Sequence, residues 1–436
     1  MKKSSRVLAW SALAACACAT PAAYATNGYF THGYGMTAKG MGGASVAMTQ
    51  DAFGGANNPA TMVWVGSRLD VGVDWFSPKR KAERSGSMGG ALDFSADSDS
   101  TNFFLPEFGY NRMLNPDMAV GLTVYGNGGM NTDYPGANTS CGAPGTTYNG
   151  LCGGGRLGVN LEQLIIAPTF SWKFHPSHSI GVAPLFGYQR FKAEGLQAFD
   201  NAPGFPPFTG APGYVTNKGT DSSTGWGIRV GYYGQIQPGF NVGAQYTSKM
   251  SMSKFDKYKG LFADGGDFDI PSHFALGTSF QVAPAWLVAL DYERINYTDV
   301  AAVSNASSNQ APMGSANGPG FGWQDVNVYK LGVQWQYNPQ LTLRAGYNHG
   351  DNPIRAQDVT FNILAPGVVR DHYTLGMTYD LGNNSAITMA YMHAAKESVT
   401  GPSMFNSPAL FGPGNGGTEK IQMYENSLGI AWGMRF

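Results

Sequence analysis

Charged residues and long apolar runs are both scarce in this sequence of 436 residues. Charged residues make up 13% of the chain, about half of their usual share in globular proteins. After the N-terminal leader, no stretch offers the roughly 18 consecutive apolar residues that a transmembrane helix needs. Lysine and arginine form no basic patch, so we expect no nucleic-acid partner. Three classes remain: a periplasmic protein, a secreted protein or an outer-membrane β-barrel.

The sequence also lacks the motifs of common hydrolases and nucleotide-binding enzymes. It contains no Gly-x-Ser-x-Gly, no His-Glu-x-x-His and no phosphate-binding loop. Its seven histidines are scattered along the chain, without the spacing typical of metal ligands. We therefore predict that the protein is not an enzyme and has no catalytic residues, no metal and no cofactor. The alternative, a lipolytic enzyme, would need a serine–histidine pair that meets only on folding.

Residues 1–25 have the layout of a secretory signal peptide. A basic start precedes an apolar stretch over residues 7–19, and residues 23–25 (Ala-Tyr-Ala) form a small-x-small cleavage site. An alternative is a lipoprotein cleavage box at residues 13–16 (Leu-Ala-Ala-Cys), so lipidation of Cys16 stays open. Both leaders predict export.

Only two cysteines lie beyond this leader, Cys141 and Cys152, both in a Gly-rich polar stretch. In an exported protein such a pair is expected to form a disulfide, here one that closes a short loop. No histidine neighbours either cysteine, which argues against a metal site.

Period-two alternation is the strongest pattern that the chain does contain. In residues 341–348, LTLRAGYN, every second residue is apolar or aromatic and the others are polar, charged or glycine. Such alternation over about ten residues is typical of membrane β-barrel strands. The strands are expected near 67–76, 102–112, 117–127, 161–174, 179–193, 224–236, 240–250, 271–282, 286–296, 325–337, 341–349, 370–381, 386–396 and 422–436.

The connections between these segments alternate in length. The short ones carry turn signals such as Asn-Pro-Asp or Gly-Asn-Asn, and the long ones are rich in Gly, Pro, Asn and Ser. The last strand alternates and ends in Phe436, which resembles the assembly signal of bacterial outer-membrane proteins. These features predict an all-β, fourteen-stranded antiparallel transmembrane barrel over residues 67–436.

Residues 40–60, GMGGASVAMTQDAFGGANNPA, show neither helical periodicity nor strand alternation. A barrel of fourteen strands leaks unless something fills it, and the segment that precedes the first strand is too apolar for a free tail. We therefore predict that residues 26–66 form a plug, or hatch, inside the barrel. The alternative is a loose periplasmic leader.

This N-terminal run, with its motif Asn58-Pro59-Ala60, resembles the hatch of the FadL-type long-chain fatty acid transporters. The resemblance extends over nearly the whole mature chain and includes a DNPI sequence at residues 351–354 and the terminal aromatic strand. It implies passive uptake of hydrophobic molecules, which are caught in an apolar groove between two outer loops and pass to an interior pocket. The hatch then shifts, and a kink in the third strand opens the wall toward the membrane. The family also includes channels for aromatic hydrocarbons.

Several residues of this chain match parts of that route. Gly126, Gly128 and Gly129 in the third strand would weaken its ladder and permit a bulge or a gap, unless they merely begin the next loop. Two loops are unusually apolar for outer loops, and together they form either a capture groove or a cap on the barrel. Their ring and leucine side chains are Phe199, Phe205, Phe208, Tyr214, Phe255, Tyr258, Leu261 and Phe262.

Alternation also places three basic residues on the inner face of the barrel, Arg229, Lys330 and Arg344. Each is a candidate for binding a ligand carboxylate, because an unpaired buried carboxylate is costly. Asp291 and Glu293 are expected to face inward too and would compete for these cations. In the loops, Lys254, Lys257 and Lys259 would either attract a carboxylate or a lipopolysaccharide phosphate, or form a solvated run of charge.

We expect a monomer in the bacterial outer membrane. Its partners would be long-chain fatty acids or similar hydrophobic molecules, together with outer-membrane lipid and lipopolysaccharide. The first alternative is a hydrocarbon channel of the same fold. The second is a structural or adhesive surface barrel, whose deletion would leave the uptake of hydrophobic molecules unchanged.

Overall fold

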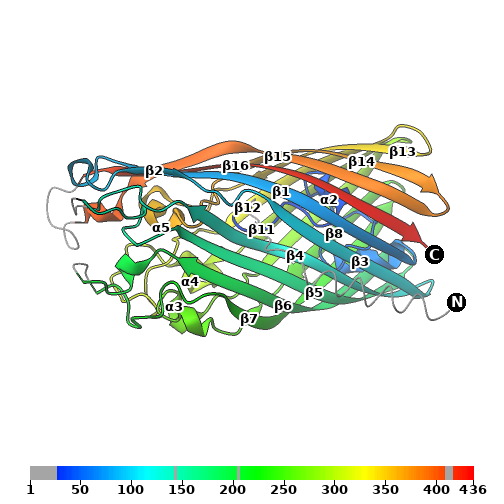
Figure 1. The fold of residues 1–436 in the computed structure, drawn as a ribbon. Coiled ribbons are helices and arrows are strands. Elements are labelled where there is room, and N and C mark those ends of the chain that lie inside the picture. Colours follow the sequence, from blue (N-terminus) through cyan, green and yellow to red (C-terminus); the bar gives the residue numbers. More distant parts are fainter. Residues whose placement is uncertain (1–26, 142–144, 204–206, 408–415) are drawn as a thin grey trace.

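The computed structural model describes residues 27–141, 145–203, 207–407 and 416–436. These residues form one sheet of 16 strands, in which β2 (Phe94–Asp97) and β9 (Ser251–Met252) are short additions to β1 and β7. The other fourteen strands are antiparallel to their neighbours and close into a barrel, because β16 pairs with β1 (Figure 1). They are β1 Arg68–Ser85, β3 Phe103–Asn115, β4 Met118–Tyr134, β5 Leu157–His175, β6 His178–Glu194, β7 Asp221–Gln237, β8 Phe240–Thr247, β10 His273–Ala283, β11 Trp286–Ile295, β12 Val326–Gln336, β13 Leu341–Gly350, β14 Asp371–Gly382, β15 Ser385–Pro402 and β16 Thr418–Arg435.

The predicted fourteen-stranded barrel is thus confirmed, and each strand lies where alternation placed it. The main differences are at strand ends. β1 continues to Ser85, β4 to Tyr134 and β15 to Pro402, well beyond the predicted ends at 76, 127 and 396. All three extensions lie toward the long loops, where the side chains no longer alternate as they do in the apolar band, so the pattern in the sequence fades before the ladder ends.

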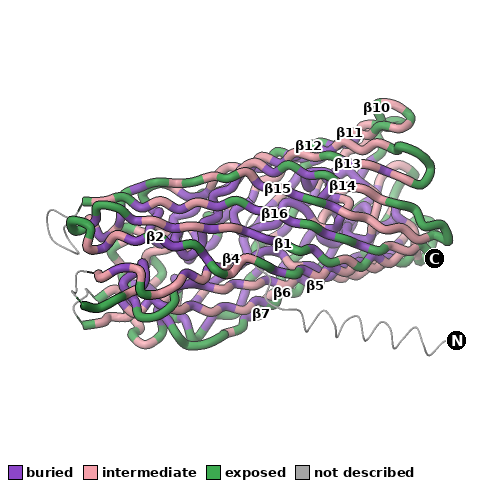
Figure 2. Tube along the Cα trace, turned by 45° about the horizontal axis from the view of Figure 1, so that its top comes forward, coloured by how far each residue is buried: buried purple, intermediate pink, exposed green. Residues whose placement is uncertain are grey.

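Residues of different burial are interspersed along the strands of the wall, as the changing colours of the trace in Figure 2 show. On β1, Val71, Val73 and Trp75 are exposed, whereas Asp70 and Asp74 between them are buried. Large apolar side chains are exposed on other strands too, for example Phe186 on β6 and Leu375 on β14. An apolar exterior around a polar interior is the arrangement that a barrel surrounded by lipid requires.

The two ends of the barrel differ. Short turns join the strands at the end where the C-terminus lies, and the long loops gather at the other end (Figure 1). At the β14–β15 turn, Asn383 and Asn384 both have positive φ, a conformation that asparagine tolerates better than most residues. The short connections are the predicted ones, at residues 116–117, 176–177, 238–239, 284–285, 337–340 and 383–384.

The helices in the described residues are all short. None of the described helices is long and apolar enough to cross a membrane. The α-helices are α2 Met36–Lys39, α3 Ala263–Gly266, α4 Ala301–Ser304 and α5 Val359–Asn362, and the 3-10 helices are η1 Pro59–Trp64, η2 Ser87–Gly90, η3 Gln197–Phe199, η4 Asp256–Tyr258, η5 Tyr297–Asp299, η6 Ala356–Asp358 and η7 Met404–Asn406.

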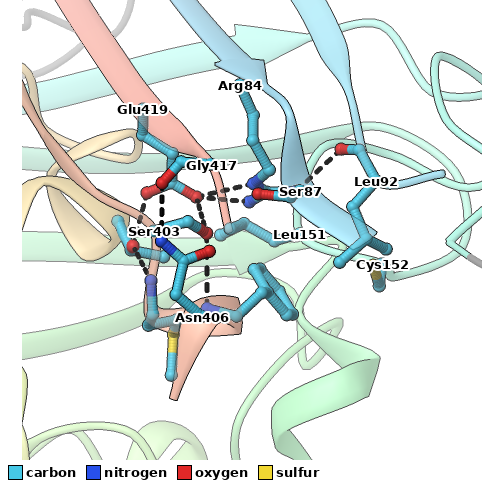
Figure 3. A network of polar contacts seen from close by, with 12 residues as sticks. Arg84, Ser87, Leu92, Leu151, Cys152, Ser403, Asn406, Gly417 and Glu419 are labelled. Carbon is cyan, nitrogen blue, oxygen red and sulfur yellow. Dashed lines mark hydrogen bonds and ion pairs between the residues drawn. The ribbon is translucent and has the colours of Figure 1, made fainter. Parts of the chain in front are cut away.

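A buried ion pair holds the loop end of the barrel where the first and last strands meet. Arg84 Nε on β1 lies 2.7 Å from Glu419 Oε1 on β16, and neither side chain is exposed. Arg84 also donates to the carbonyl of Leu92, and Ser403 Oγ donates to Glu419 (Figure 3). Removing one partner of such a pair leaves a buried charge uncompensated, so the closing strands depend on both.

A disulfide joins Cys141 and Cys152 in the loop after β4. Beside the disulfide the chain returns on itself, because Thr139, just before Cys141, exchanges backbone hydrogen bonds in both directions with Tyr148. We expect the double variant Cys141→Ser/Cys152→Ser to keep the barrel but to loosen this loop. The cross-link lowers the conformational entropy of the open loop, which stabilises the closed loop by about 3 kcal/mol. Limited proteolysis should then cut within residues 135–156 faster than in the unmodified protein, whereas the barrel should stay heat-resistant on gels. Equal cleavage rates would contradict this role for the disulfide.

Candidate functional site

Residues 27–66 lie almost entirely buried, and their polar groups bond to the inner face of the wall. Asp291 on β11 accepts hydrogen bonds from the backbone N–H of Ser45 and Val46, at 2.6 and 2.9 Å. Lys39 Nζ lies 2.8 Å from Asp74 on β1 and 3.7 Å from Glu107 on β3. Carboxylates of the wall therefore satisfy donors that this non-regular segment would otherwise bury unpaired.

Asn58, Pro59 and Ala60 make the most specific of these contacts. Asn58 Nδ2 donates to the carbonyls of Val46 and Tyr232, both at 2.8 Å, and its Oδ1 accepts from the N–H of Ala60. Pro59 begins η1, where its missing N–H and fixed φ suit a helix start. The motif is therefore explained by local structure: an asparagine caps a proline-led turn and ties it to the wall.

The strands opposite this motif carry glycine at the points of closest approach. A Cβ on Gly181 would lie 2.3 Å from Pro59 C, and one on Gly231 would lie 2.0 Å from Asn58 Oδ1. The hydroxyls of Ser171 and Ser179 both donate to the carbonyl of Ala60. Close backbone approach is thus possible only because β6 and β7 carry no side chain at these positions.

The three basic residues predicted to face inward do so, and each is buried, but they do not form one site. Arg229 Nη1 donates to the carbonyls of Gly55 and Ala56, at 2.6 and 2.5 Å. Lys330 Nζ forms an ion pair with Glu293 at 2.8 Å. The competition expected from inward acids is therefore real for Lys330, whereas Arg229 is occupied by backbone oxygens of the N-terminal segment.

Arg344 differs from Lys330 because it has no acidic partner, and from Arg229 because it bonds only to side chains. Its guanidinium donates to Gln334 at 2.9 Å, Thr378 at 2.7 Å and Gln50 at 3.2 Å. It lines a cavity of about 540 Å³ at the short-turn end of the barrel. Most of the cavity's lining is polar, including Gln50, Asp51, Arg68, Asp70, Gln334, Gln336, Thr378, Asn383 and Asn384.

Two ionisable groups of the N-terminal segment respond to their burial. Burial, with the nearby charge of Asp70, raises the pKa of Asp51 to about 6, against the opposing effect of Arg68. Burial also lowers the pKa of His32 well below its usual value, and His372, Lys39 and Lys330 add to that effect. His32 stacks on His372 with ring centroids 6.1 Å apart. The segment is thus held in place with a neutral imidazole against the wall.

The wall itself is interrupted between β3 and β4. Their pairing begins at the short turn and ends at Phe108↔Val124. Beyond that point β3 stays paired with β1 as far as Phe103, and β4 stays paired with β5 as far as Tyr134. Residues 103–107 of β3 therefore have no ladder partner on β4, in a region that the structure describes completely.

The predicted glycines lie at this interruption. The register of β4 against β5 shifts between Gly126 and Gly128, which is a bulge at Asn127. The N-terminal segment occupies the edge that β3 leaves: Phe30 pairs with Gly128, and the N–H of Gly129 donates to the carbonyl of Tyr29 at 3.1 Å. A Cβ on Gly128 would lie 1.9 Å from that carbonyl oxygen, so only glycine fits there.

The aromatic residues of the two apolar loops pack mainly on one another. Phe199, Phe255, Tyr258 and Phe262 are buried, and the last three surround Phe191 at centroid distances of 4.6–5.6 Å. Phe199, Leu261 and Phe262 also line a small apolar cavity of about 40 Å³. The rings therefore pack on one another beside a small apolar hollow, and a role in capturing a ligand stays a prediction.

Other predicted members of the groove lie at its edge. Phe208 packs on Phe199 at 5.1 Å, and Tyr214 is 41% exposed beneath Lys259, whose Nζ is 4.0 Å from the ring centroid. Phe205 lies outside the described residues. Lys257 Nζ donates to the carbonyl of Thr220 and Lys254 Nζ to that of Asp264, so each loop lysine already has a contact within the chain.

An aromatic cluster that the sequence does not predict surrounds the start of the N-terminal segment. Tyr29 lies 5.2 Å from Tyr297 and 5.9 Å from Trp323, centroid to centroid, and Tyr297 and Trp323 meet edge to face. Tyr297 Oη accepts from the N–H of Tyr29 and donates to the carbonyl of Asn27. Tyr297 and Trp323 lie in loops, where no periodicity marks them. The sequence offers one signal only: Tyr297 follows the end of β11 closely, and Trp323 comes shortly before the start of β12.

Comparison with known proteins gives a consistent result. The family model described as outer membrane protein transport protein (OMPP1/FadL/TodX) matches residues 11–406. The long-chain fatty acid transport proteins of Escherichia coli O157:H7 and Salmonella typhi are each 21% identical to the chain, over 90% of its length and 93% of theirs.

Solved structures show the same fold. The toluene transporter TodX of P. putida matches with a TM-score of 0.68 at 19% identity, over 93% of this chain and 99% of its own. A FadL homologue of Pseudomonas aeruginosa matches with a TM-score of 0.66 at 15% identity, over 94% and 100%. The closed barrel, the inward polar face and the family match over most of the sequence agree: the chain belongs to the OMPP1/FadL/TodX family of outer-membrane transport proteins.

Proposed function

We propose that the protein imports hydrophobic small molecules passively, from the outer loops through the lumen and sideways into the membrane between β3 and β4. The observation that carries this proposal is the interrupted ladder at residues 103–107, behind which the N-terminal segment pairs with Gly128. In this view residues 26–66 are the hatch and residues 67–436 the barrel. The apolar loop cluster around Phe199 and Phe262 is the entry.

A lateral exit suits an apolar cargo better than the short-turn mouth does. That mouth holds a cavity lined by Asp51, Arg68, Asp70 and Arg344, so a hydrophobic molecule leaving there would enter a polar, hydrated space. Each Å² of apolar surface kept from water is favourable by about 25 cal/mol, and the lipid beside β3 and β4 offers that environment directly. Opening would require Tyr29 and Phe30 to separate from Gly128 and Gly129, which breaks only a few backbone hydrogen bonds.

Bridging the interruption should stop transport. Pro106 on β3 and Gly126 on β4 both have the strand parity of the lipid-facing side. We expect Pro106→Cys/Gly126→Cys, joined by a cleavable bifunctional thiol reagent, to lower uptake of a labelled hydrophobic substrate to background, and cleavage of the linker to restore it. Cysteines at Tyr110 and Leu122, which are directly paired on the same two strands, are the matched control. Unchanged uptake through the bridged protein would sink the lateral route.

An Asn58 variant tests whether the hatch is anchored inside the barrel. Asn58→Ala removes two side-chain hydrogen bonds to backbone carbonyls and the cap of η1, so docking of the segment should weaken by about 1–3 kcal/mol. Hydrogen exchange should accelerate at the amides of residues 44–60 more than in the strands. Asn57→Ala, which removes one bond to the carbonyl of Tyr34, should change exchange much less. If both variants left exchange as it is, the assignment of Asn58 as an anchor would be wrong.

Long-chain fatty acids are the first candidate substrate. Of the three candidate cations for the carboxylate, Arg344 is the one that neither pairs with an acid nor bonds to backbone carbonyls, and the polar cavity that it lines suits a charged headgroup but not the apolar chain. We expect Arg344→Gln to weaken uptake of labelled oleate about tenfold or more, the effect of losing one charge-assisted hydrogen bond, and to leave toluene uptake unchanged. Lys330→Gln should instead disturb Glu293, its ion-pair partner, and affect both substrates through folding.

An aromatic hydrocarbon is the second candidate, and the ring cluster of Tyr29, Tyr297 and Trp323 favours it. Arg229 already bonds to backbone carbonyls and Lys330 already pairs with Glu293. The interior near the ring cluster therefore suits an uncharged aromatic molecule better than a carboxylate. Cells that carry the protein should then take up toluene faster than cells without it, with oleate uptake unchanged. Loss of neither flux on deletion would favour the structural or adhesive barrel.

A further inference from the structure

A row of lysines crosses the outside of the barrel where its first and last strands meet. Lys79 on β1 is paired in register with Tyr424 on β16, and Lys81 with Gln422. On the other side of β16, the register against β15 shifts between Ala394 and Glu397. That bulge places Lys396 opposite Tyr424, so two lysines flank one tyrosine across three adjacent strands.

These side chains lie on the outer face. Lys79 has the same strand parity as Val73 and Trp75, which are exposed, whereas Arg80 beside it is buried. Tyr424 is 37% exposed, and Lys396 is exposed as well. A surface cavity of about 370 Å³ is lined by Lys79, Lys81, Lys396, Gln422 and Tyr424, together with Arg80, Asp97, Ser98, Thr101 and Met423.

The position of the lysine row along the barrel axis matches the boundary of the apolar band. From Arg68, at the short-turn end, to Lys79 the strand rises about 28 Å along the barrel axis, taking ~3.3 Å per residue and a tilt of ~40°. The apolar band of such barrels is about 25 Å tall. The exposed side chains of Trp75, Tyr391 and Leu428 lie just below the row, so the lysines are at the level of lipid headgroups on the side of the long loops.

The row carries surplus positive charge. Lys81 forms an ion pair with Glu83, but no ion pair in the described part of the chain involves Lys79 or Lys396. Asp97 is the one acidic residue that lines the cavity. Lys254, Lys257 and Lys259 in the loops are different, because each already contacts a carbonyl or a ring of the chain.

We propose that Lys79 and Lys396, with Tyr424 between them, bind the phosphate groups of a lipid in the outer leaflet, which in a bacterial outer membrane is the phosphorylated glycolipid lipopolysaccharide. Lysines at a membrane surface attract anionic headgroups, and a phosphate accepts hydrogen bonds from both ammonium groups and from a tyrosine hydroxyl. The lipid chains would lie along Trp75 and Leu428 below. This inference is independent of the transport route.

The test measures lipid A binding to the purified protein in detergent by native mass spectrometry. For Lys79→Gln/Lys396→Gln, affinity for diphosphoryl lipid A should fall about 30-fold, equivalent to about 2 kcal/mol. Lys79→Arg/Lys396→Arg should keep most of the affinity. Dephosphorylated lipid A should bind the unmodified protein and the glutamine variant equally weakly.

The matched control is Lys192→Gln/Lys218→Gln, which removes one half-exposed and one exposed lysine elsewhere and should leave affinity within about twofold. An equal loss in this control would mean that net charge, not the row, holds the lipid. Undiminished binding to the glutamine variant would overturn the site, as would inorganic phosphate displacing the lipid at equal concentration, because the ligand would then be free phosphate. Heat-resistant migration on gels establishes that each variant is folded.

Discussion

Backbone hydrogen bonding in a medium without water is the constraint on which this fold depends. Lipid offers no partner to a strand amide, so the sheet must close, and pairing of β16 with β1 along their whole length closes it. The constraint then acts inside as well. At the interruption between β3 and β4, Tyr29 and Phe30 supply part of the pairing that β4 lacks. The N-terminal segment and the imperfect ladder are therefore two parts of one solution to the same requirement.

Much of the barrel could be predicted because lipid imposes its demands on every strand. Outward residues such as Val73 and Trp75 must be apolar, and inward ones such as Asp74 need not be, so a period of two is written into the sequence. Turn residues with positive φ, such as Asn383 and Asn384, mark the short connections. The inward orientation of Arg229, Lys330 and Arg344 followed from the same pattern.

Alternation could not predict what the inward side chains contact. The partner of Arg229 is a pair of backbone carbonyls in a segment about 170 residues away in sequence, and no local pattern encodes such a contact. The same holds for Tyr29, Tyr297 and Trp323, which come together from three separate regions. The apolar loop rings were recognisable by composition, but their mutual burial around Phe191 depends on how the loops fold over the barrel.

The glycines of the wall have a consequence for the divergence of these proteins. Where Gly181 and Gly128 face the N-terminal segment, the two surfaces meet mainly through main-chain atoms, with little side-chain shape to match. Such main-chain contacts tolerate most side-chain substitutions on either surface, provided that the wall glycines are kept. Sequences can then drift far apart while the fold is kept, as a shared fold at 19% identity illustrates.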